Sequence, residues 1–416
     1  MLAVLVLATV GGAPTAACAS PEDQPSGDDS DGQPEGSPAP GTPESEPEQT
    51  EFTLLSAGDV LPHTPVIEAA RQPGGGYDFL PLMEPVGEWV EQADLSLCGM
   101  EVPVRAEGRA PSGYPEFGAP DELVEDLSAL GFDGCTTATN HSLDGGIGAL
   151  ERTLDLFDEA GMGHVGTARS AEESEAAQMY RLSRGGREIT VAHISTTLLH
   201  NVPPPQDSWW VTDVAADQLT ALAASARDEG ADLVLASVHW GEEYVDTPGA
   251  EEQRYAEQLA AGGEVDVVFG NHSHTPLPLR QLDGGPADEG MWVVWSMGNF
   301  LSNQDEQCCV PRTAVGTMVL ADVEAPAEGR VRVTDLSWTP VTVDRTHGYR
   351  GILPLAELNE LTELTDGELP EDTGLTEERV ETRYQQLLEV MDEDSMATDP
   401  PRTEEPVEVE VLPRSD

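Results

Sequence analysis

The stretch that most restricts the fold is residues 265–274, Val-Asp-Val-Val-Phe-Gly-Asn-His-Ser-His. A short apolar run followed by glycine predicts a buried strand that ends in a turn. Such a turn can direct His272 and His274 into one cleft, where imidazole suits Zn, Mn or Fe. Taken alone, the pair also fits two surface or capping histidines in a loop. A metal site therefore requires ligands from other parts of the chain.

Candidate partners for the two histidines stand at the ends of other predicted strands. Four more strands are expected, and each leads to an oxygen or nitrogen ligand: Asp59, Glu101, Asn140 and His239. Ligands of open α/β sheets gather beyond the carboxyl ends of the strands, so these side chains are expected to converge. His63 is a further candidate. Each residue alone also fits a plain role as a turn residue, a helix cap or a solvated loop side chain.

Helical periodicity separates these strands and predicts an α/β fold. Amphipathic helices are expected over residues 79–92, 120–130, 147–160, 215–229 and 250–261. A β-hairpin is expected over residues 178–196, because two strand-like runs flank Gly185-Gly186. The pattern places one folded domain over residues 52–354.

Carboxylates, histidines and one asparagine together match a two-metal centre, in which ions ~3.5–4 Å apart act on a water and on substrate oxygens. His141, beside the proposed ligand Asn140, is placed to protonate a leaving oxygen, a general-acid role worth roughly 10²–10⁴-fold. Asp144 either orients the His141 ring or caps the following helix. The sequence therefore predicts a hydrolytic metal centre.

Both ends of the chain differ from its middle. Residues 1–18 are predicted to be a signal peptide, in which Thr15-Ala16-Ala17-Cys18 resembles a bacterial lipobox with Cys18 as the lipidated residue. An ordinary signal peptide with an incidental cysteine is the alternative. Residues 19–51 hold 10 acids and no base and predict a disordered, Pro-rich tether. Residues 355–416 predict an acidic tail with one possible helix, at 376–391, and disorder elsewhere.

The net charge restricts the possible binding partners, and the cysteines bear on the cellular compartment. The formal net charge is -58 and the basic side chains are arginines, so nucleic acid is excluded as a partner. Export permits disulfides, and a bridge between Cys98 and Cys135 is expected because each lies in or near a predicted strand. For the adjacent Cys308 and Cys309, a strained vicinal disulfide and metal ligation are both open.

Six segments resemble the ordered motifs of the CapA family of poly-γ-glutamate capsule synthesis proteins, over about residues 52–345. They are Gly58-Asp59 with His63, Gly99–Pro103, Thr139–Asp144, His239–Tyr244, Gly270–His274 and Ser296–Phe300. The chain departs from the family in having Gly99 and Thr139 where asparagine is usual. Leu61 also replaces the histidine of the Asp-x-His opening of ordinary metallophosphoesterases, which leaves one or two metals open.

The resemblance implies a calcineurin-like metallophosphoesterase fold, a four-layer sandwich of two mixed β-sheets flanked by helices. It also implies divalent metal ions, two in number if both sites are filled (Mn, Zn or Fe), and the general-acid role of His141. The metal ligands it implies are Asp59, Glu101, Asn140, His239, His272 and His274.

The implied protein is a metal-dependent hydrolase in capsule or envelope polymer biosynthesis, anchored by lipid to the outer face of the cell membrane. Its substrate would be an anionic polymer or a phosphoester, and its partners membrane proteins of capsule synthesis and export. The alternative is a non-catalytic, metal-stabilised component of such a complex.

Overall fold

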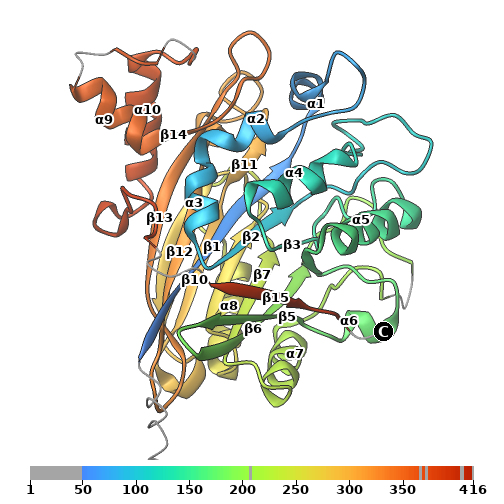
Figure 1. Ribbon diagram of the computed structural model, residues 1–416, viewed down its shortest axis with the longest axis vertical. Coiled ribbons are helices and arrows are strands. Elements are labelled where there is room, and N and C mark those ends of the chain that lie inside the picture. Colours follow the sequence, from blue (N-terminus) through green and yellow to red (C-terminus); the bar gives the residue numbers. More distant parts are fainter. Residues whose placement is uncertain (1–48, 206–208, 365–367, 371–372, 403–406, 415–416) are drawn as a thin grey trace, which may run out of the picture. The chain divides into compact units, whose positions relative to one another are not determined.

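Two β-sheets form the centre of the protein in the computed structural model, which describes residues 49–205, 209–364, 368–370, 373–402 and 407–414 (Figure 1). The first sheet has the order β14 (Gly351–Pro354), β13 (Arg332–Asp344), β12 (Val315–Ala325), β1 (Thr50–Leu61), β2 (Leu95–Met100), β3 (Gly134–Thr136) and β4 (Gly163–Val165), with β11 (Asn299–Ser302) also pairing with β1. The second has the order β15 (Glu408–Leu412), β5 (Gln178–Arg184), β6 (Arg187–Thr197), β7 (Leu233–His239), β8 (Val267–Asn271), β10 (Met291–Met297) and β9 (Pro276–Leu282).

Helices occupy most of the connections. They are α1 (Thr64–Ala70), α2 (Leu80–Met83), α3 (Gly87–Gln92), α4 (Glu122–Leu130), α5 (Ile147–Ala160), α6 (Ala171–Ser174), α7 (Ala216–Asp228), α8 (Ala250–Gly262), α9 (Leu355–Leu364) and α10 (Glu377–Leu388). Short 3-10 turns lie at Glu84–Val86, Pro286–Asp288, Pro311–Ala314 and Glu393–Ser395. Among the described residues, no helix has both the length and the apolar character needed to cross a bilayer.

The layers follow from the alternation of side chains along each strand. In β1, Phe52 and Leu54 enter the core between the two sheets, whereas Leu55 and Ala57 pack under α2, α3 and α4. The outer face of the second sheet packs against α7 and α8. Both sheets contain parallel and antiparallel pairs. The prediction of two mixed sheets flanked by helices is confirmed.

Parallel pairing brings distant strand ends together. Asp59 of β1 pairs in register with Gly99 of β2, and His239 of β7 pairs with Asn271 of β8. Because β2 and β8 are followed directly by the Glu101 and His272 motifs, each sheet collects candidate ligands at one edge. The predicted disulfide is confirmed next to this edge, since Cys98 of β2 is bonded to its register partner Cys135 of β3.

The prediction of a largely disordered C-terminal tail is wrong for its described residues. Helix α10 lies within the predicted helix, but α9 and β15 were not predicted. The helices bury Leu355, Val380 and Leu387 in the core that also contains Trp338 of β13. The tail was mispredicted because its acidic composition conceals apolar side chains that recur at helical and strand spacing.

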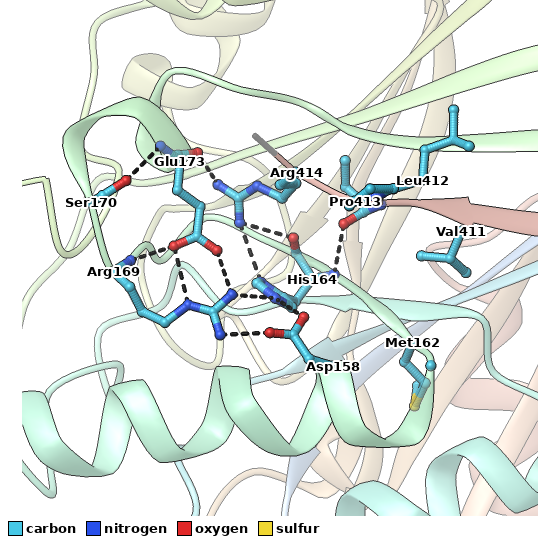
Figure 2. Close-up of a pocket in the computed structure, with 12 residues that line it drawn as sticks. Asp158, Met162, His164, Arg169, Ser170, Glu173, Val411, Leu412, Pro413 and Arg414 are labelled. Carbon is cyan, nitrogen blue, oxygen red and sulfur yellow. Dashed lines mark hydrogen bonds and ion pairs between the residues drawn. The ribbon is translucent and has the colours of Figure 1, made fainter. Parts of the chain in front are cut away.

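Strand β15 closes one edge of the second sheet by pairing antiparallel with β5, and Arg414 holds its end (Figure 2). The Arg414 guanidinium donates to the carbonyl oxygens of His164 and Thr167 at 3.0 and 3.1 Å. The surrounding residues line a cavity of about 600 Å³. The predicted signal peptide, Cys18 and nearly all of the predicted tether lie outside the described residues, and β1 already begins at Thr50.

Candidate metal centre

Asp59 is fixed by a close crossing of backbones. A Cβ atom on Gly58 would lie 2.0 Å from the Gly298 carbonyl oxygen, so only glycine fits before Asp59. The Asp59 amide donates to that same oxygen at 2.9 Å. The crossing therefore holds the Asp59 carboxylate at the edge of the sheet, where it is 1% exposed.

Glu101 follows β2 and lies between histidines from two different motifs. Its Oε1 is 3.7 Å from His274 Nε2 and 3.9 Å from His239 Nε2. Thr139 Oγ1 donates to the Glu101 carbonyl oxygen at 2.5 Å, so the threonine that departs from the family pattern positions this residue. Glu101 thus occupies the place of a bridging carboxylate.

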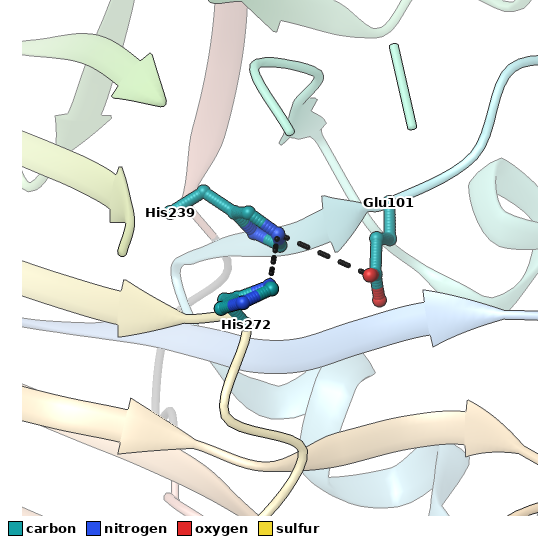
Figure 3. Close-up of side chains that lie close together, drawn as sticks. All are labelled: Glu101, His239 and His272. Carbon is teal, nitrogen blue, oxygen red and sulfur yellow. Dashed lines mark hydrogen bonds and ion pairs between the residues drawn. The ribbon is translucent and has the colours of Figure 1, made fainter. Parts of the chain in front are cut away.

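The first ligand group consists of Glu101, His239 and His272 (Figure 3). His239 Nε2 is 3.2 Å from His272 Nδ1 and 2.9 Å from Asn140 Oδ1. The ligand atoms of the three residues that define the group lie within 4.8 Å of one another. Asn140 extends the group with an amide oxygen.

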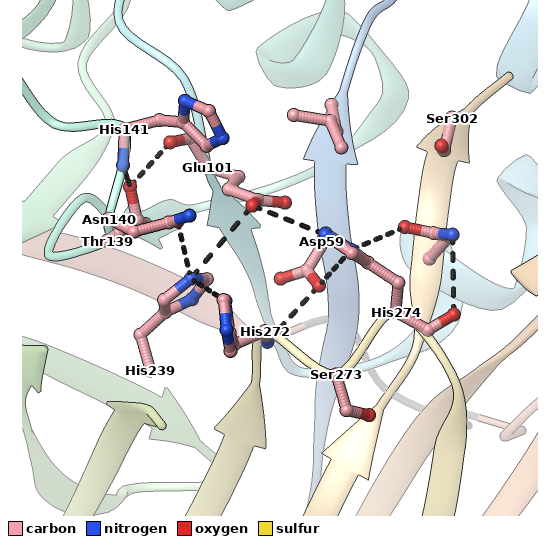
Figure 4. A network of polar contacts seen from close by, with 12 residues as sticks. Asp59, Glu101, Thr139, Asn140, His141, His239, His272, Ser273, His274 and Ser302 are labelled. Atoms are coloured by element: carbon pink, nitrogen blue, oxygen red, sulfur yellow. Dashed lines mark hydrogen bonds and ion pairs between the residues drawn. The ribbon is translucent and has the colours of Figure 1, made fainter. Parts of the chain in front are cut away.

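The second ligand group consists of Asp59, Glu101 and His274 and lies beside the first (Figure 4). His274 Nδ1 is 3.2 Å from Asp59 Oδ2 and 3.1 Å from Asn299 Oδ1. His272 and His274 have φ angles of 94° and 58°, a strained conformation for residues other than glycine. Such strain is concentrated at functional sites.

The two groups contain buried polar atoms that lack protein partners. Asp59 Oδ1, both Glu101 carboxylate oxygens and His239 Nδ1 have no hydrogen-bond partner within the described part of the chain. Two buried carboxylates that share one cationic imidazole, that of His274, are costly. Oxygen and imidazole donors around two such carboxylates therefore fit divalent metal ions.

The pKa values of the candidate ligands indicate which of them are charged before a metal ion binds. Burial raises the pKa of Glu101 well above its ordinary value and lowers the pKa of His239 well below its own. Burial lowers the pKa of His272 to about 3. Burial also acts to lower the pKa of His274, but the carboxylates of Glu101 and Asp59 raise it to about 9. At neutral pH, His239 and His272 are accordingly neutral, which is the form that binds a metal.

His141 is oriented by Asp144. His141 Nδ1 donates to Asp144 Oδ2 at 2.7 Å, and the Phe117 amide donates to the same oxygen at 2.8 Å. The Phe117 ring packs edge-on against the His141 ring at 4.8 Å between centroids. Helix α5 has Gly146 as its N-cap, so neither Asn140 nor Asp144 caps it. Of the two roles open for Asp144, the structure has the orienting one.

His63 lies near the centre but outside both ligand groups. Its Nδ1 is 3.0 Å from the Leu61 carbonyl oxygen, and its ring packs against Phe117. Burial, reinforced by repulsion from His274, lowers the pKa of His63 to about 4. His63 is therefore a neutral neighbour of the ligands in this structure.

Several neighbours of the ligands were not predicted. Asn271 occupies the space beside Gly99, where a Cβ atom would lie 2.6 Å from Asn271 Nδ2. The glycine that departs from the family pattern is thus matched by an asparagine from the other sheet. Asn201 approaches His141 Nε2 at 3.3 Å from a loop whose path no periodicity reveals. Asn299 lies in the Ser296–Phe300 motif, but the sequence did not indicate a role for it.

A sequence comparison decides the family. The profile described as Bacterial capsule synthesis protein PGA_cap matches residues 53–304, more than half of the 416 residues. The chain belongs to this family. All residues of both ligand groups fall within the matched part, and the resemblance to CapA proteins drawn from the motifs is confirmed.

Named relatives of this PGA_cap chain include two CapA proteins. Capsule biosynthesis protein CapA of Bacillus anthracis is 24% identical over 266 residues, 62% of this chain and 61% of the relative. PGA biosynthesis protein CapA of Bacillus subtilis is 24% identical over 217 residues, 52% and 53% of the two chains. The chain thus spans less than two thirds of the length of either relative.

Solved structures with some likeness include a nucleotidase and a calcineurin-like phosphoesterase. Haemophilus influenzae NAD nucleotidase (NadN) is 12% identical with a TM-score of 0.42, over 85% of this chain and 58% of that one. The calcineurin-like phosphoesterase YfkN of Bacillus subtilis is 15% identical with a TM-score of 0.40, over 82% and 97%. The fold of this PGA_cap chain is assigned from its own strand order and layers.

Proposed function

We propose that this chain is a metal-dependent hydrolase of the phosphoester type in capsule or cell-envelope polymer biosynthesis. The observation that carries the proposal is that two adjacent ligand groups share one buried carboxylate, Glu101, whose oxygens have no hydrogen-bond partner among the described residues. Two divalent ions held there, Mn, Zn or Fe, would supply an activated water and polarise phosphoryl oxygens. The names of the CapA relatives support the assignment to capsule polymer metabolism.

The protein's own contribution to the reaction is assigned to His141. Asp144 accepts a hydrogen bond from the Nδ1–H group of His141. The proton that a leaving oxygen needs is therefore the one on Nε2 of the imidazolium. The Asp144 carboxylate also stabilises the ring while it carries positive charge. His141 is 7% exposed, so its proton is delivered where bulk water is largely excluded.

Charge at the mouth of the centre favours a substrate with few negative charges. Glu243 acts on the pKa values of both Glu101 and His274, which places its charge near the ligands. A long polyanion meets this charge and the overall charge of -58, screened only beyond ~8–10 Å at moderate salt. We therefore propose a phosphoester of an envelope component as substrate, with the anionic polymer itself as the second candidate.

The test combines metal content with turnover. Protein purified without added ions is analysed for bound metal and assayed with Mn or Zn on a model phosphodiester and on γ-glutamyl polymer. Asp59→Ala should abolish turnover and lower the metal content, whereas Asp228→Ala, on the exposed end of α7, should change neither. Turnover that survives Asp59→Ala would sink the proposal.

A structural role for the metal is the second candidate function. Asp59 and Glu101 come from the first sheet, whereas His239, His272 and His274 come from the second. A bound ion would therefore clamp the two sheets together, as suits a non-catalytic component of a synthesis or export complex. Tight metal binding and metal-dependent stability without turnover of either substrate would favour this role.

Attachment to the outer face of the membrane and partnership with membrane proteins of capsule synthesis and export complete the proposal. Support comes from the lipobox-like sequence before Cys18 and from the names of the relatives. Cells grown with a labelled fatty acid should label the chain at Cys18, and Cys18→Ser should abolish the label. Capsule synthesis proteins should then co-purify with the lipidated chain and not with Cys18→Ser.

A further inference from the structure

Two adjacent thiols lie in a loop next to the candidate metal centre. In the dithiol loop, residues 303–310, Cys309 Sγ is 2.7 Å from Cys308 Sγ. Cys308 is exposed and Cys309 is half-buried, and these are the free cysteines of the described chain. Burial and the neighbouring thiol raise the pKa of Cys309 to about 12. Cys308 is therefore the thiol that a small disulfide in solution can reach, and Cys309 is in contact with it as its partner.

The loop geometry brings the two thiols together. The amides of Cys308 and Cys309 both donate to the Asp305 carbonyl oxygen, at 3.2 and 3.0 Å. The buried Asp305 carboxylate forms an ion pair with the half-buried Arg345, whose Nη1 is 3.7 Å from Cys308 Sγ. The turn that holds the thiols is thus anchored by a partly buried ion pair.

Side chains connect this dithiol to a histidine of the second ligand group. The Cys309 thiol hydrogen-bonds with the Tyr244 hydroxyl, which accepts from Gln304 Nε2 at 3.4 Å. Gln304 Oε1 accepts from Asn299 Nδ2 at 3.0 Å, and Asn299 Oδ1 is 3.1 Å from His274 Nδ1. A change at the thiols therefore reaches His274 through a continuous series of contacts.

We propose that Cys308 and Cys309 form a redox modification site that reacts with small disulfides and alters the affinity of the adjacent metal centre. Cys308 Sγ attacks one sulfur of the disulfide, forms a mixed disulfide and releases one thiol. Cys309 Sγ then attacks Cys308 Sγ, forms the vicinal bond and releases the second thiol. The protein loses two protons and two electrons, and the small disulfide gains both. The effect on metal affinity rests on the proposed metal centre.

The chemistry makes this bond reversible. Adjacent Cα atoms are about 3.8 Å apart, below the roughly 4.4–6.8 Å usual for disulfides, so a vicinal bond is strained. Strained disulfides are the readily reduced ones. Closing the bond also converts the sulfur that contacts the Tyr244 hydroxyl from a thiol into a disulfide sulfur. Loss of a group in direct contact with a metal ligand typically costs about 10–100-fold in metal affinity, and Cys309 lies three contacts beyond such a group, Asn299. The oxidised protein should therefore bind metal up to about 10-fold more weakly.

The test uses glutathione disulfide on the full chain and measures thiols, mass and Mn²⁺ or Zn²⁺ binding directly. We expect loss of both free thiols and of two hydrogen atoms, a linked Cys308–Cys309 peptide, and weaker metal binding that mild dithiothreitol restores. Cys98–Cys135 should remain intact. Cys308→Ser with Cys309→Ser should bind metal equally well with and without the reagent.

Each contrary result overturns one part of the inference. A stable mixed disulfide at Cys308, or no reaction, overturns the modification site. A vicinal bond that leaves metal affinity unchanged overturns the connection to His274. Neither readout uses turnover, so a protein without phosphoesterase activity can still show the redox reaction and the change in metal affinity. Failure of this inference and failure of the proposed function are therefore separate results.

Discussion

Two clusters of histidines and carboxylates differ in whether arginine is present and in how deeply their acids are buried. In the cavity beside β15, Arg169 contacts Asp158 and Glu173 at 2.6 and 2.8 Å. At the metal centre, Asp59 and Glu101 face histidines alone, and three of their four carboxylate oxygens lack a hydrogen-bond partner in the described chain. The comparison teaches that buried carboxylates without an arginine partner mark a ligand site better than the presence of acids and histidines does.

The pKa values follow the same difference. Burial raises the pKa of Glu101, and the nearby charges do not offset this effect. Burial also acts to raise the pKa of Asp158, but hydrogen bonds from His164 and Arg169 lower it to about 2. One cluster therefore stabilises its anions with arginine as well as histidine, whereas the other has one cationic imidazole, that of His274, for two buried carboxylates. The predictions below test this contrast.

The largest expected effect compares two buried histidines that each contact an aspartate. His141 pairs with Asp144 at 2.7 Å and His164 with Asp158 at 3.1 Å. His141→Ala should lower kcat roughly 10²–10⁴-fold at unchanged metal content, since a general acid is lost. His164→Ala should lower stability and leave kcat unchanged. Equal kcat values for the two variants would contradict the assignment of His141.

The next effect compares two glutamates, Glu101 and Glu173, by stability. Glu173→Gln should lower the free energy of unfolding by about 1–3 kcal/mol, because Arg169 loses its charged partner. Glu101→Gln should stabilise the chelator-treated protein, because it removes a buried carboxylate that has no hydrogen-bond donor among the described residues, while abolishing metal binding. Denaturant unfolding with and without EDTA measures both. Destabilisation of the metal-free protein by Glu101→Gln would break the contrast.

A smaller effect is expected where β15 packs against the inner core, which is the hydrophobic core between the two sheets. Val409 contacts this core from one face of the strand, and Glu408 is exposed on the other. Val409→Thr should lower the free energy of unfolding by about 1 kcal/mol, since apolar contact is replaced by a hydroxyl. Glu408→Gln should have no effect, and both variants should bind metal normally. Metal loss in Val409→Thr would show that the edge strand supports the centre.

The sequence predicted the parts that depend on local pattern. Strand ends after apolar runs located Asp59, Glu101, His239 and the two histidines of residues 270–274, and pairing within each sheet brought them together. Contacts between the sheets were not predictable, because nothing local records that Asn271 fills the space beside Gly99.

The acidic tail was mispredicted for a related reason. Its net composition favours disorder, but Val407, Val409 and Val411 alternate and pack against the inner core. The average composition of the tail does not reveal an alternation of only three apolar residues. The arginine contacts of the cavity depend equally on this strand, since Arg414 follows it.

The smallest effect is the pH dependence of stability, which should have opposite signs in the two clusters. Asp158 has a pKa lowered from 3.8 to about 2, so its contribution is present above its unfolded value and is lost as pH falls through that range. Glu101 has a raised pKa, so the metal-free protein is favoured with Glu101 protonated and loses stability as pH rises above 4.5. Unfolding of chelator-treated protein across pH should show both trends. Asp158→Asn should flatten the acid side alone and Glu101→Gln the other side alone, whereas one variant that flattened both would mean that the two clusters are coupled.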